Sequence, residues 1–186
     1  MSKEDNALRW YERALETGDD SEAQFMKLWI AFNSLYDKHR KRNEDKTWNT
    51  ERERIVLLCE ERNKDLIGYD PFTEDRKAMQ KLADLPVLSG WRVPNNRCRP
   101  RLPLDSIEPQ EMSPYELWGV VCLGHGFKRV QCLLLTLYQV RCNLFHGSKD
   151  PDLRRDQELV DSAARIMQRY MGTLLHVVPP SKQSAR

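Results

Sequence analysis

The sequence predicts an all-α fold of about five to seven helices that pack as a bundle in one domain, residues 1–178. Apolar residues recur at three- and four-residue spacing along most of the chain, which is typical of helices with one buried face. Capping signals precede several of these segments, and no alternating pattern typical of strands accompanies them. A chain of 186 residues is long enough to bury a sizeable core without metals or disulfides.

The first half of the sequence predicts four helices. The first covers about residues 4–17 and ends at Gly18. The second begins with a capping box at Ser21 and carries an aromatic-rich apolar face. Another capping box, at Thr50, begins the third, and the pair at 70–71 (Asp-Pro) begins a short fourth helix.

An irregular basic loop is expected at 86–112, because the helical pattern stops there. No acidic residue occurs between positions 86 and 103, and such a segment either is a solvated excursion or follows a phosphate backbone. Solvation is the commoner role of a charge run, so both interpretations stay open. The candidate RNA-binding residues in this loop are Arg92, Arg97, Arg99 and Arg101.

Three more helices are expected after the loop. A capping box at Ser113 begins the first of them, and the most apolar helix of the chain follows at about 127–146, ending at Gly147. The pair at 150–151 (Asp-Pro) is expected to cap the final amphipathic helix. Residues 179–186, which begin with two prolines, are predicted to form a disordered tail.

Composition narrows the class of protein. Lys and Arg number 30 and Asp and Glu number 28, a net charge of +2, so any nucleic-acid surface must be local. No apolar stretch is long enough for a membrane span, and no secretion signal follows Met1. We therefore expect a cytoplasmic protein without a membrane partner or a cofactor, whose cysteines are buried reduced thiols: Cys59, Cys98, Cys122, Cys132 and Cys142.

Metal binding and acid–base pairs of carboxylates are both disfavoured by the pattern. Cys122 and His125 have the spacing of a zinc-ligand pair, with Cys132 further along, but no second close pair completes a tetrahedral set. Pairs of acids such as Glu51 and Glu53 are assigned to solvated helix faces. No metal site is therefore predicted.

Arg141 is an unexpected residue on the most apolar predicted helix. On an ideal helix, Val130, Leu134, Leu137 and Phe145 lie within about 40° of it. A guanidinium stays charged in a protein, and an unpaired charge in a dry interior is costly. Two interpretations follow: either a buried carboxylate pairs with Arg141, or this face opens onto a cleft or interface where an anion binds.

His146 follows Arg141 by five residues. Histidine exchanges protons near neutral pH, and arginine presents a fork of donors to phosphate oxygens, so together they suit metal-free phosphodiester chemistry. His146 alone is also explained as a cation at a helix C-terminus, with Gly147 as the cap. The two side chains are about 140° apart on an ideal helix, so either the helix end frays or a second copy completes the site.

The segment from Arg141 to His146 resembles the R-x4–6-H motif of the HEPN superfamily, at its shortest spacing. It stands near the end of the penultimate predicted helix, and Gly147 and a final amphipathic helix follow it. The aromatic-rich segment 29–36 is similar to an early helix of such domains. The resemblance covers about residues 21–177, and it implies an all-α bundle that dimerises so that two motifs share one cleft.

Many members of that superfamily are metal-independent endoribonucleases of toxin, phage-defence or RNA-processing systems, so the resemblance implies an RNA substrate. In them the ribose 2′-hydroxyl attacks the adjacent phosphate, which leaves a 2′,3′-cyclic phosphate and a 5′-hydroxyl. His146 matches the catalytic histidine and Arg141 the phosphate-stabilising arginine. The next position is often Asn in active members; here Cys142 occupies it and Asn143 follows, and both are expected to support the site.

Two functions therefore remain open from the sequence. The first is a homodimeric endoribonuclease with Arg141 and His146 in a shared active site, restrained by an antitoxin or accompanied by a sensor. Its basic surface would include the loop arginines and the stretch from Lys38 to Lys46. The alternative is a catalytically silent HEPN-like module that binds a protein or a nucleotide, in which Arg141 is retained for structure.

Overall fold

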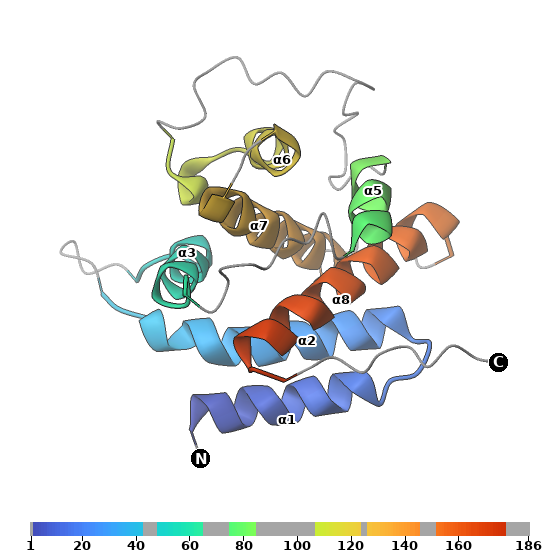
Figure 1. The fold of residues 1–186 in the computed structure, drawn as a ribbon, viewed down its shortest axis with the longest axis horizontal. Helices are drawn as coiled ribbons and strands as arrows, with labels where there is room; N and C mark the ends of the chain where they lie inside the picture. The colour runs from blue at the N-terminus through green and yellow to red at the C-terminus, as the bar shows by residue number, and fades with distance from the viewer. Residues whose placement is uncertain are drawn as a thin grey trace.

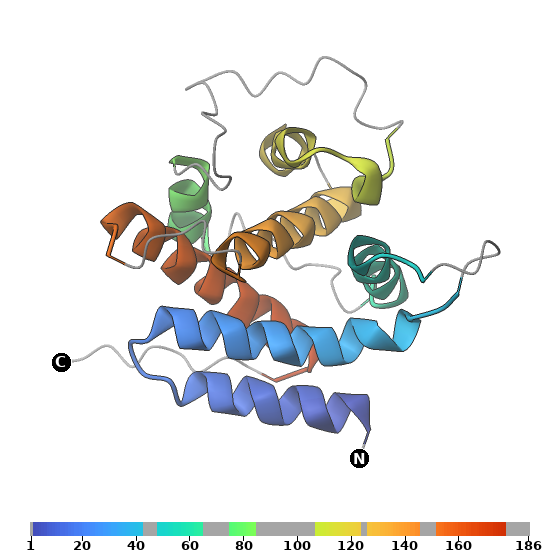
Figure 2. The same ribbon diagram turned by 180° about the vertical axis from the view of Figure 1, so that it is seen from behind.

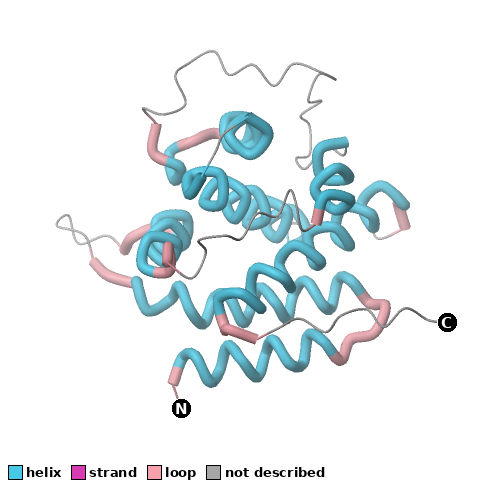
Figure 3. The backbone as a smooth tube through the Cα atoms, viewed as in Figure 1, coloured by secondary structure: helices cyan, strands magenta, loops and turns pink. Residues whose placement is uncertain are grey.

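The computed structural model describes residues 2–42, 48–64, 75–84, 107–123, 126–145 and 152–177. Over these residues the fold is all-α, as predicted, and contains no strand beyond an isolated antiparallel bridge between Arg42 and Trp48 (Figure 3). The described helices are α1 (Lys3–Leu15), α2 (Ser21–Tyr36), α3 (Glu51–Glu61), α5 (Arg76–Asp84), α6 (Pro114–Leu123), α7 (Gly126–Phe145) and α8 (Arg154–Leu174), with short 3-10 helices η1 (Asp37–His39) and η3 (Pro109–Glu111).

Helix α2 is the centre of the arrangement. Helices α1 and α2 lie side by side and antiparallel. Helix α8 crosses α2 and packs on a side of it that α1 does not cover (Figures 1 and 2). Helix α6 packs on α7, α5 packs on α8, and α3 contacts both α2 and α7. None of the described helices has the length and apolar character that a membrane crossing needs.

The predicted apolar face of α2 forms the middle of the core. Its aromatic residues follow one another at helical spacing, with ring centroids 5.4 Å apart for Trp29 and Phe32 and 5.1 Å apart for Phe32 and Tyr36. Tyr170 of α8 meets Phe32 edge-on at 5.7 Å. Such a pair contributes about 0.5–1.5 kcal/mol beyond its buried area, so the contact of Phe32 with Tyr170 helps to join α2 to α8.

Two of the predicted capping boxes are confirmed. The Thr50 hydroxyl accepts a hydrogen bond from the backbone of Glu53 at 3.2 Å, and the Glu53 carboxylate accepts one from the Thr50 backbone. At α6 the Ser113 backbone donates to the Glu116 carboxylate at 2.7 Å, and the Ser113 hydroxyl accepts in return. The N-termini of α3 and α6 are therefore fixed by local sequence.

The predicted cap at Ser21 is wrong by one residue. Asp20 caps α2, with its carboxylate accepting from the backbone of Ala23 at 2.9 Å. Ser21 is the first helical residue, and its hydroxyl donates to Asp161 of α8 at 3.0 Å. A carboxylate caps a helix N-terminus at least as well as a hydroxyl, which leaves Ser21 available for this contact with α8.

The predicted cap of the final helix is also displaced. Helix α8 begins at Arg154 with Leu153 in the capping position, and no side chain caps it. The pairs at 70–71 and 150–151 lie outside the described residues, as does the predicted tail 179–186.

The end of the predicted basic loop is ordered and partly buried. Residues 107–112 include η3, and the Met112 side chain is buried in the core. The Arg52 guanidinium of α3 donates to the backbone carbonyls of Pro109, at 3.2 Å, and Met112. These bonds join α3 to the segment before α6, a contact between distant parts of the sequence that the local pattern does not predict.

Candidate functional site

Arg141 lies at the edge of the core, in the last turns of α7. Its side chain is 26% exposed, and its guanidinium carbon is 4.6 Å from the centre of the Phe145 ring. The Nε atom is buried and has no hydrogen-bond partner among the described residues. Buried donors without a partner are rare and costly, but because this atom is shielded from solvent, an oxyanion could reach the guanidinium only through its exposed part.

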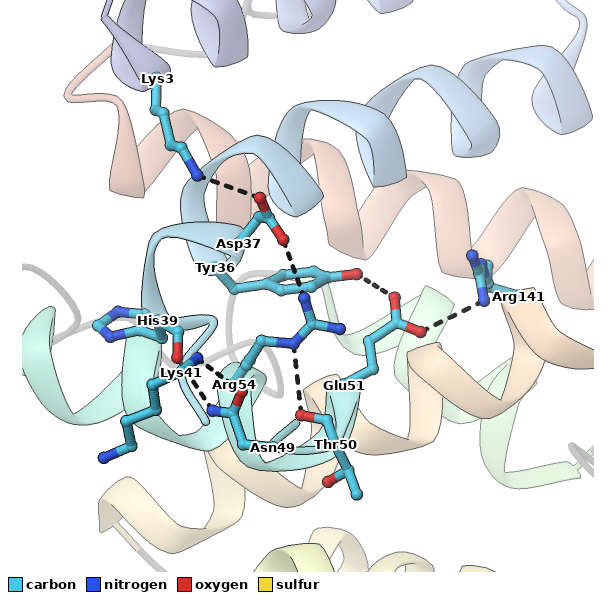
Figure 4. Close-up of polar contacts among 10 residues, drawn as sticks. All are labelled: Lys3, Tyr36, Asp37, His39, Lys41, Asn49, Thr50, Glu51, Arg54 and Arg141. Atoms are coloured by element: carbon cyan, nitrogen blue, oxygen red, sulfur yellow. Dashed lines mark hydrogen bonds and ion pairs between the residues drawn. The ribbon is translucent and has the colours of Figure 1, made fainter. Parts of the chain in front are cut away.

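Glu51 is the carboxylate partner of Arg141. Its Oε2 atom is 3.6 Å from Arg141 Nη1, and its side chain is 21% exposed. The other oxygen, Oε1, accepts a hydrogen bond from the Tyr36 hydroxyl (Figure 4). Glu51 is the first residue of α3, so the Thr50 cap fixes its position and the positive end of the helix dipole favours its charge. Side chains from α2, α3 and α7 thus converge on one point.

Both interpretations of Arg141 find some support in this geometry. A carboxylate does pair with it, but that carboxylate is half-buried rather than buried, and the contact is longer than a good charge-assisted hydrogen bond. Nε takes no part in the pair. The guanidinium is held by one carboxylate on one side and retains donor capacity toward a second anion.

The tyrosines around the site keep their protons at neutral pH. Burial is the largest cause that raises the pKa of Tyr36 well above its ordinary value. The carboxylate of Glu51 raises it further, because it accepts the hydroxyl proton in a hydrogen bond and carries a negative charge. Burial also raises the pKa of Tyr138, with a further contribution from its hydrogen bond with Cys142. Tyr36 therefore acts as a proton-bearing donor to the Glu51 carboxylate, which it orients.

A second layer of charges holds Tyr36 in place. Arg54 of α3 lies with its guanidinium carbon 5.7 Å from the centre of the Tyr36 ring. Its Nη1 donates to Asp37 at 2.9 Å, and Lys3 of α1 donates to the other oxygen of Asp37 at 3.1 Å (Figure 4). Because these groups come from three helices, the ring that anchors Glu51 is positioned by the bundle as a whole.

The two predicted supporting residues behave differently. Cys142 is half-buried, and its sulfur is 3.9 Å from Arg141 Nη1, so it does lie beside the guanidinium. Asn143 is buried, and its side-chain oxygen accepts from Gln139 at 3.0 Å, within the same helix. The structure thus brings Cys142 to Arg141 and gives Asn143 a partner on its own helix.

The prediction of buried thiols holds for two cysteines and fails for one. Cys59 and Cys132 are buried, and burial raises the pKa of each thiol to about 12, so neither is a nucleophile at neutral pH. Cys142 is only half-buried, because it lies at the boundary of the core next to Arg141.

Several predicted site residues lie outside the described part of the chain. These are His146, which directly follows the last residue of α7, and the loop arginines Arg92, Arg97, Arg99 and Arg101. The side chain of Cys122 and the whole of His125 lie outside it as well. Within the described ranges, no three His, Cys, Asp or Glu side chains are grouped so that they could hold a metal ion.

Glu51 and Tyr36 are the site residues that the sequence does not predict. Sequence reasoning assigns Glu51 to a solvated face and Tyr36 to the core. The capping box at Thr50 is the available signal, because it places Glu51 in the first turn of a helix, where a carboxylate is fixed in direction. Its pairing with α7 depends on the tertiary packing of α3, which no local pattern encodes.

This arrangement can bind an oxyanion at a positioned, half-exposed guanidinium and stabilise negative charge there. Comparison of the chain with protein-family models, with curated proteins and with solved structures finds no match in any of the three.

Proposed function

We propose that this protein is a metal-independent endoribonuclease of HEPN type, in which Arg141 stabilises the phosphate and His146 transfers a proton. The observation that supports it most is the state of Arg141: its side chain is 26% exposed, and its one described carboxylate contact is 3.6 Å long. A purely structural arginine is expected to make short hydrogen bonds to protein acceptors, as Arg52 does with two backbone carbonyls. In the sequence His146 directly follows the last residue of α7, the helix that carries Arg141.

The proposed reaction needs only groups that RNA and this chain supply. The ribose 2′-oxygen forms a bond to the adjacent phosphorus and gives up its proton to a base, while the bond from phosphorus to the 5′-oxygen breaks and that oxygen takes a proton. The products are a 2′,3′-cyclic phosphate and a 5′-hydroxyl. Arg141 stabilises the extra negative charge on the phosphate oxygens, and His146 serves as the base or the acid.

A homodimer is part of the proposal. One imidazole per site can take the first proton, but the leaving oxygen also needs a donor, and a second copy of the motif would supply it. The exposed Phe145 ring, 59% accessible beside Arg141, is the kind of apolar surface that a second copy would cover. A cytoplasmic toxin or phage-defence role, with an antitoxin or sensor partner, would follow from such an activity.

The Glu51 pair favours a second candidate, a catalytically silent module that binds a protein or a nucleotide. In that case the contact between Arg141 and Glu51, supported by Tyr36, serves mainly to join α3 and α7. The two candidates differ in what Arg141 contributes: activity in the first and stability in the second.

The deciding experiment is cleavage of a pool of structured RNAs in excess EDTA by the wild type and by His146→Ala and Arg141→Ala. We expect cleavage by the wild type with 2′,3′-cyclic phosphate ends, and a loss of at least about 100-fold in each variant. His176→Asn is the matched histidine control: His176 has a φ of 54°, a conformation that asparagine accepts, and it is not part of the site.

Three outcomes would count against the proposal. Absence of cleavage by all proteins, folded and dimeric, would favour the binding module. Equal cleavage by the wild type and His146→Ala would indicate a contaminant or another site. Loss of cleavage in His176→Asn as large as in His146→Ala would show that the assay reports folding rather than catalysis.

A further inference from the structure

The segment that precedes α3 carries an exposed aromatic ring among cations. Trp48 is 49% exposed, although tryptophan is the largest apolar side chain. The guanidinium carbons of Arg40 and Arg42 are 4.8 Å and 5.3 Å from its ring centroid. Arg42 and Trp48 also form the antiparallel bridge noted above. We call the four residues Arg40, Lys41, Arg42 and Trp48 the Trp48 cluster.

A buried amide holds this cluster in place. Asn49 is 5% exposed, and its side chain donates to the carbonyl of His39 at 2.9 Å and accepts from the backbone of Lys41 at 3.1 Å. The Asn49 backbone donates to the Lys41 carbonyl at 3.1 Å. Figure 4 shows the Asn49 side chain joined to both residues. Three hydrogen bonds therefore join the backbone that follows Trp48 to the segment that carries Arg40 and Arg42.

The positive charge of the cluster is not neutralised by the described part of the protein. Lys38 and His39, immediately before it, both contact the carboxylate of Glu61. Among the described residues, no carboxylate pairs with Arg40, Lys41 or Arg42, and all three are exposed. Two guanidiniums against one accessible indole, with the exposed Lys41 between them in sequence, are suited to a ligand that is both anionic and aromatic.

The cluster lies next to the proposed active site along the chain. Trp48 precedes Glu51 by three residues, so their Cα atoms are at most about 11 Å apart. Glu51 in turn contacts Arg141. The cluster and the residue that contacts Arg141 therefore belong to one short segment of the chain.

We infer that the Trp48 cluster binds single-stranded RNA, with an unpaired base stacked on the Trp48 indole or an adjacent guanidinium plane and phosphates paired with the arginines and Lys41. Stacking requires a base outside a duplex, so the cluster selects single-stranded over paired RNA. This inference rests on the proposed function for its biological meaning, because it names the substrate class of that same site.

The test measures binding separately from cleavage. The probe is a labelled 2′-O-methyl oligonucleotide of mixed sequence and about 12 nucleotides, which has no 2′-hydroxyl to attack phosphorus. Fluorescence anisotropy compares the wild type with Trp48→Leu and Trp48→Tyr. We expect affinity to fall about tenfold for Trp48→Leu and to stay within about twofold for Trp48→Tyr, since tyrosine retains an aromatic face.

The arginines are tested through the salt dependence of binding. Replacement of Arg40 or Arg42 by Gln should lower the slope of log affinity against log salt by about 0.7 for each phosphate that the side chain no longer neutralises. Arg154→Gln is the matched control, because Arg154 is 89% exposed and lies at the start of α8, in another part of the chain. Thermal unfolding of each variant should match the wild type, since all these side chains are exposed.

The outcomes separate this inference from the proposed function. Trp48-dependent binding of the probe, with natural RNA left intact, would support the cluster and contradict the ribonuclease. If natural RNA is cleaved but the wild type and Trp48→Leu bind the probe equally, the ribonuclease is supported and the role of the Trp48 cluster is contradicted. Equal affinity for a duplex of the same sequence would overturn the stacking. Absence of any binding would overturn the inference and leave an acidic protein surface as the ligand class for this patch.

Discussion

Two arginine–carboxylate contacts in this molecule are built in opposite ways. The Asp75 side chain has no exposed surface, and its two oxygens lie 2.8 Å from Arg165 Nε and 2.7 Å from Arg169 Nε. The contact between Glu51 and Arg141 is 3.6 Å long, and both side chains are partly exposed. The first contact joins the start of α5 to α8, and the second joins α3 to α7.

The difference indicates two roles for the same pair of chemical groups. A carboxylate without solvent is stable only if its charge is fully matched, and Asp75 has two guanidiniums for that purpose. Glu51 matches only part of the donor capacity of Arg141, and solvent reaches both. The Asp75 contact therefore serves the fold, whereas under the proposed function the Glu51 contact positions a cation for another anion.

The largest loss of stability is expected from Asp75→Ala, which removes the buried carboxylate that contacts Arg165 and Arg169. Two guanidiniums lose their partner, although both are partly exposed and become hydrated. We expect the free energy of unfolding to fall by about 3 kcal/mol and Tm to fall by about 6–12 °C. Denaturant and thermal unfolding measure this, with exposed Asp19→Ala as the control. A change no larger than in the control would show that the Asp75 contact is not structural.

Arg141→Ala is expected to cost clearly less stability than Asp75→Ala. Its ion pair is long and partly exposed, and Phe145 loses only a covering group. We expect a loss of about 1 kcal/mol, or about 2–4 °C in Tm. The same unfolding experiments compare the two variants directly. If Arg141→Ala unfolds as easily as Asp75→Ala, Arg141 is a structural residue and the silent module is favoured over the ribonuclease.

Tyr36→Phe removes the hydroxyl that orients Glu51. We expect a loss of about 0.5–1 kcal/mol at pH 8 from the hydrogen bond. The raised pKa of Tyr36 means that the folded state keeps this proton when the unfolded state releases it, so the stabilisation falls as pH rises above about 10. Denaturant unfolding at pH 8 and pH 11 should show the difference between wild type and variant narrowing. A constant difference would mean that the folded state does not hold the Tyr36 proton more tightly than the unfolded state does.

Glu51→Gln is expected to have the smallest effect on stability, under about 0.5 kcal/mol, because it keeps an acceptor for Tyr36 and removes one partly exposed ion pair. Its effect on the proposed cleavage tests whether Glu51 positions Arg141. Arg141 then binds phosphate without competition but is no longer held in direction, so KM and kcat should both fall. Steady-state kinetics on RNA separate the two parameters. Unchanged kcat would show that Glu51 does not position Arg141.

The features of this structure that the sequence predicts are those that depend on residues close together in the chain. The helices, the capping boxes at Thr50 and Ser113 and the apolar face of α2 depend on residues a few positions apart, so the sequence predicts them. Arg141 stands out in the sequence for the same reason, since its place on the apolar face follows from helical periodicity.

The partners of the charged residues could not be predicted in this way. Glu51 meets Arg141, and Asp75 meets Arg165 and Arg169, only after distant helices have packed. On the sequence Glu51 is one acid among several: the capping box assigns a role to Glu53, but nothing local indicates that Glu51 meets an arginine of a distant helix. The Trp48 cluster is only partly predictable: the basic stretch is plain in the sequence, but the exposure of the indole and the bonds of Asn49 to His39 and Lys41 are not.

The packing of α2 on α8 has a consequence for how the chain is made. Helices α1 and α2 can pair as soon as they are synthesised, because their contacts are close in sequence. The aromatic face of α2, however, is covered by Tyr170 and its neighbours, which are synthesised much later. Until α8 leaves the ribosome, this row of rings is not covered by Tyr170. The nascent chain therefore exposes an apolar surface during translation, and we expect chaperones to bind there.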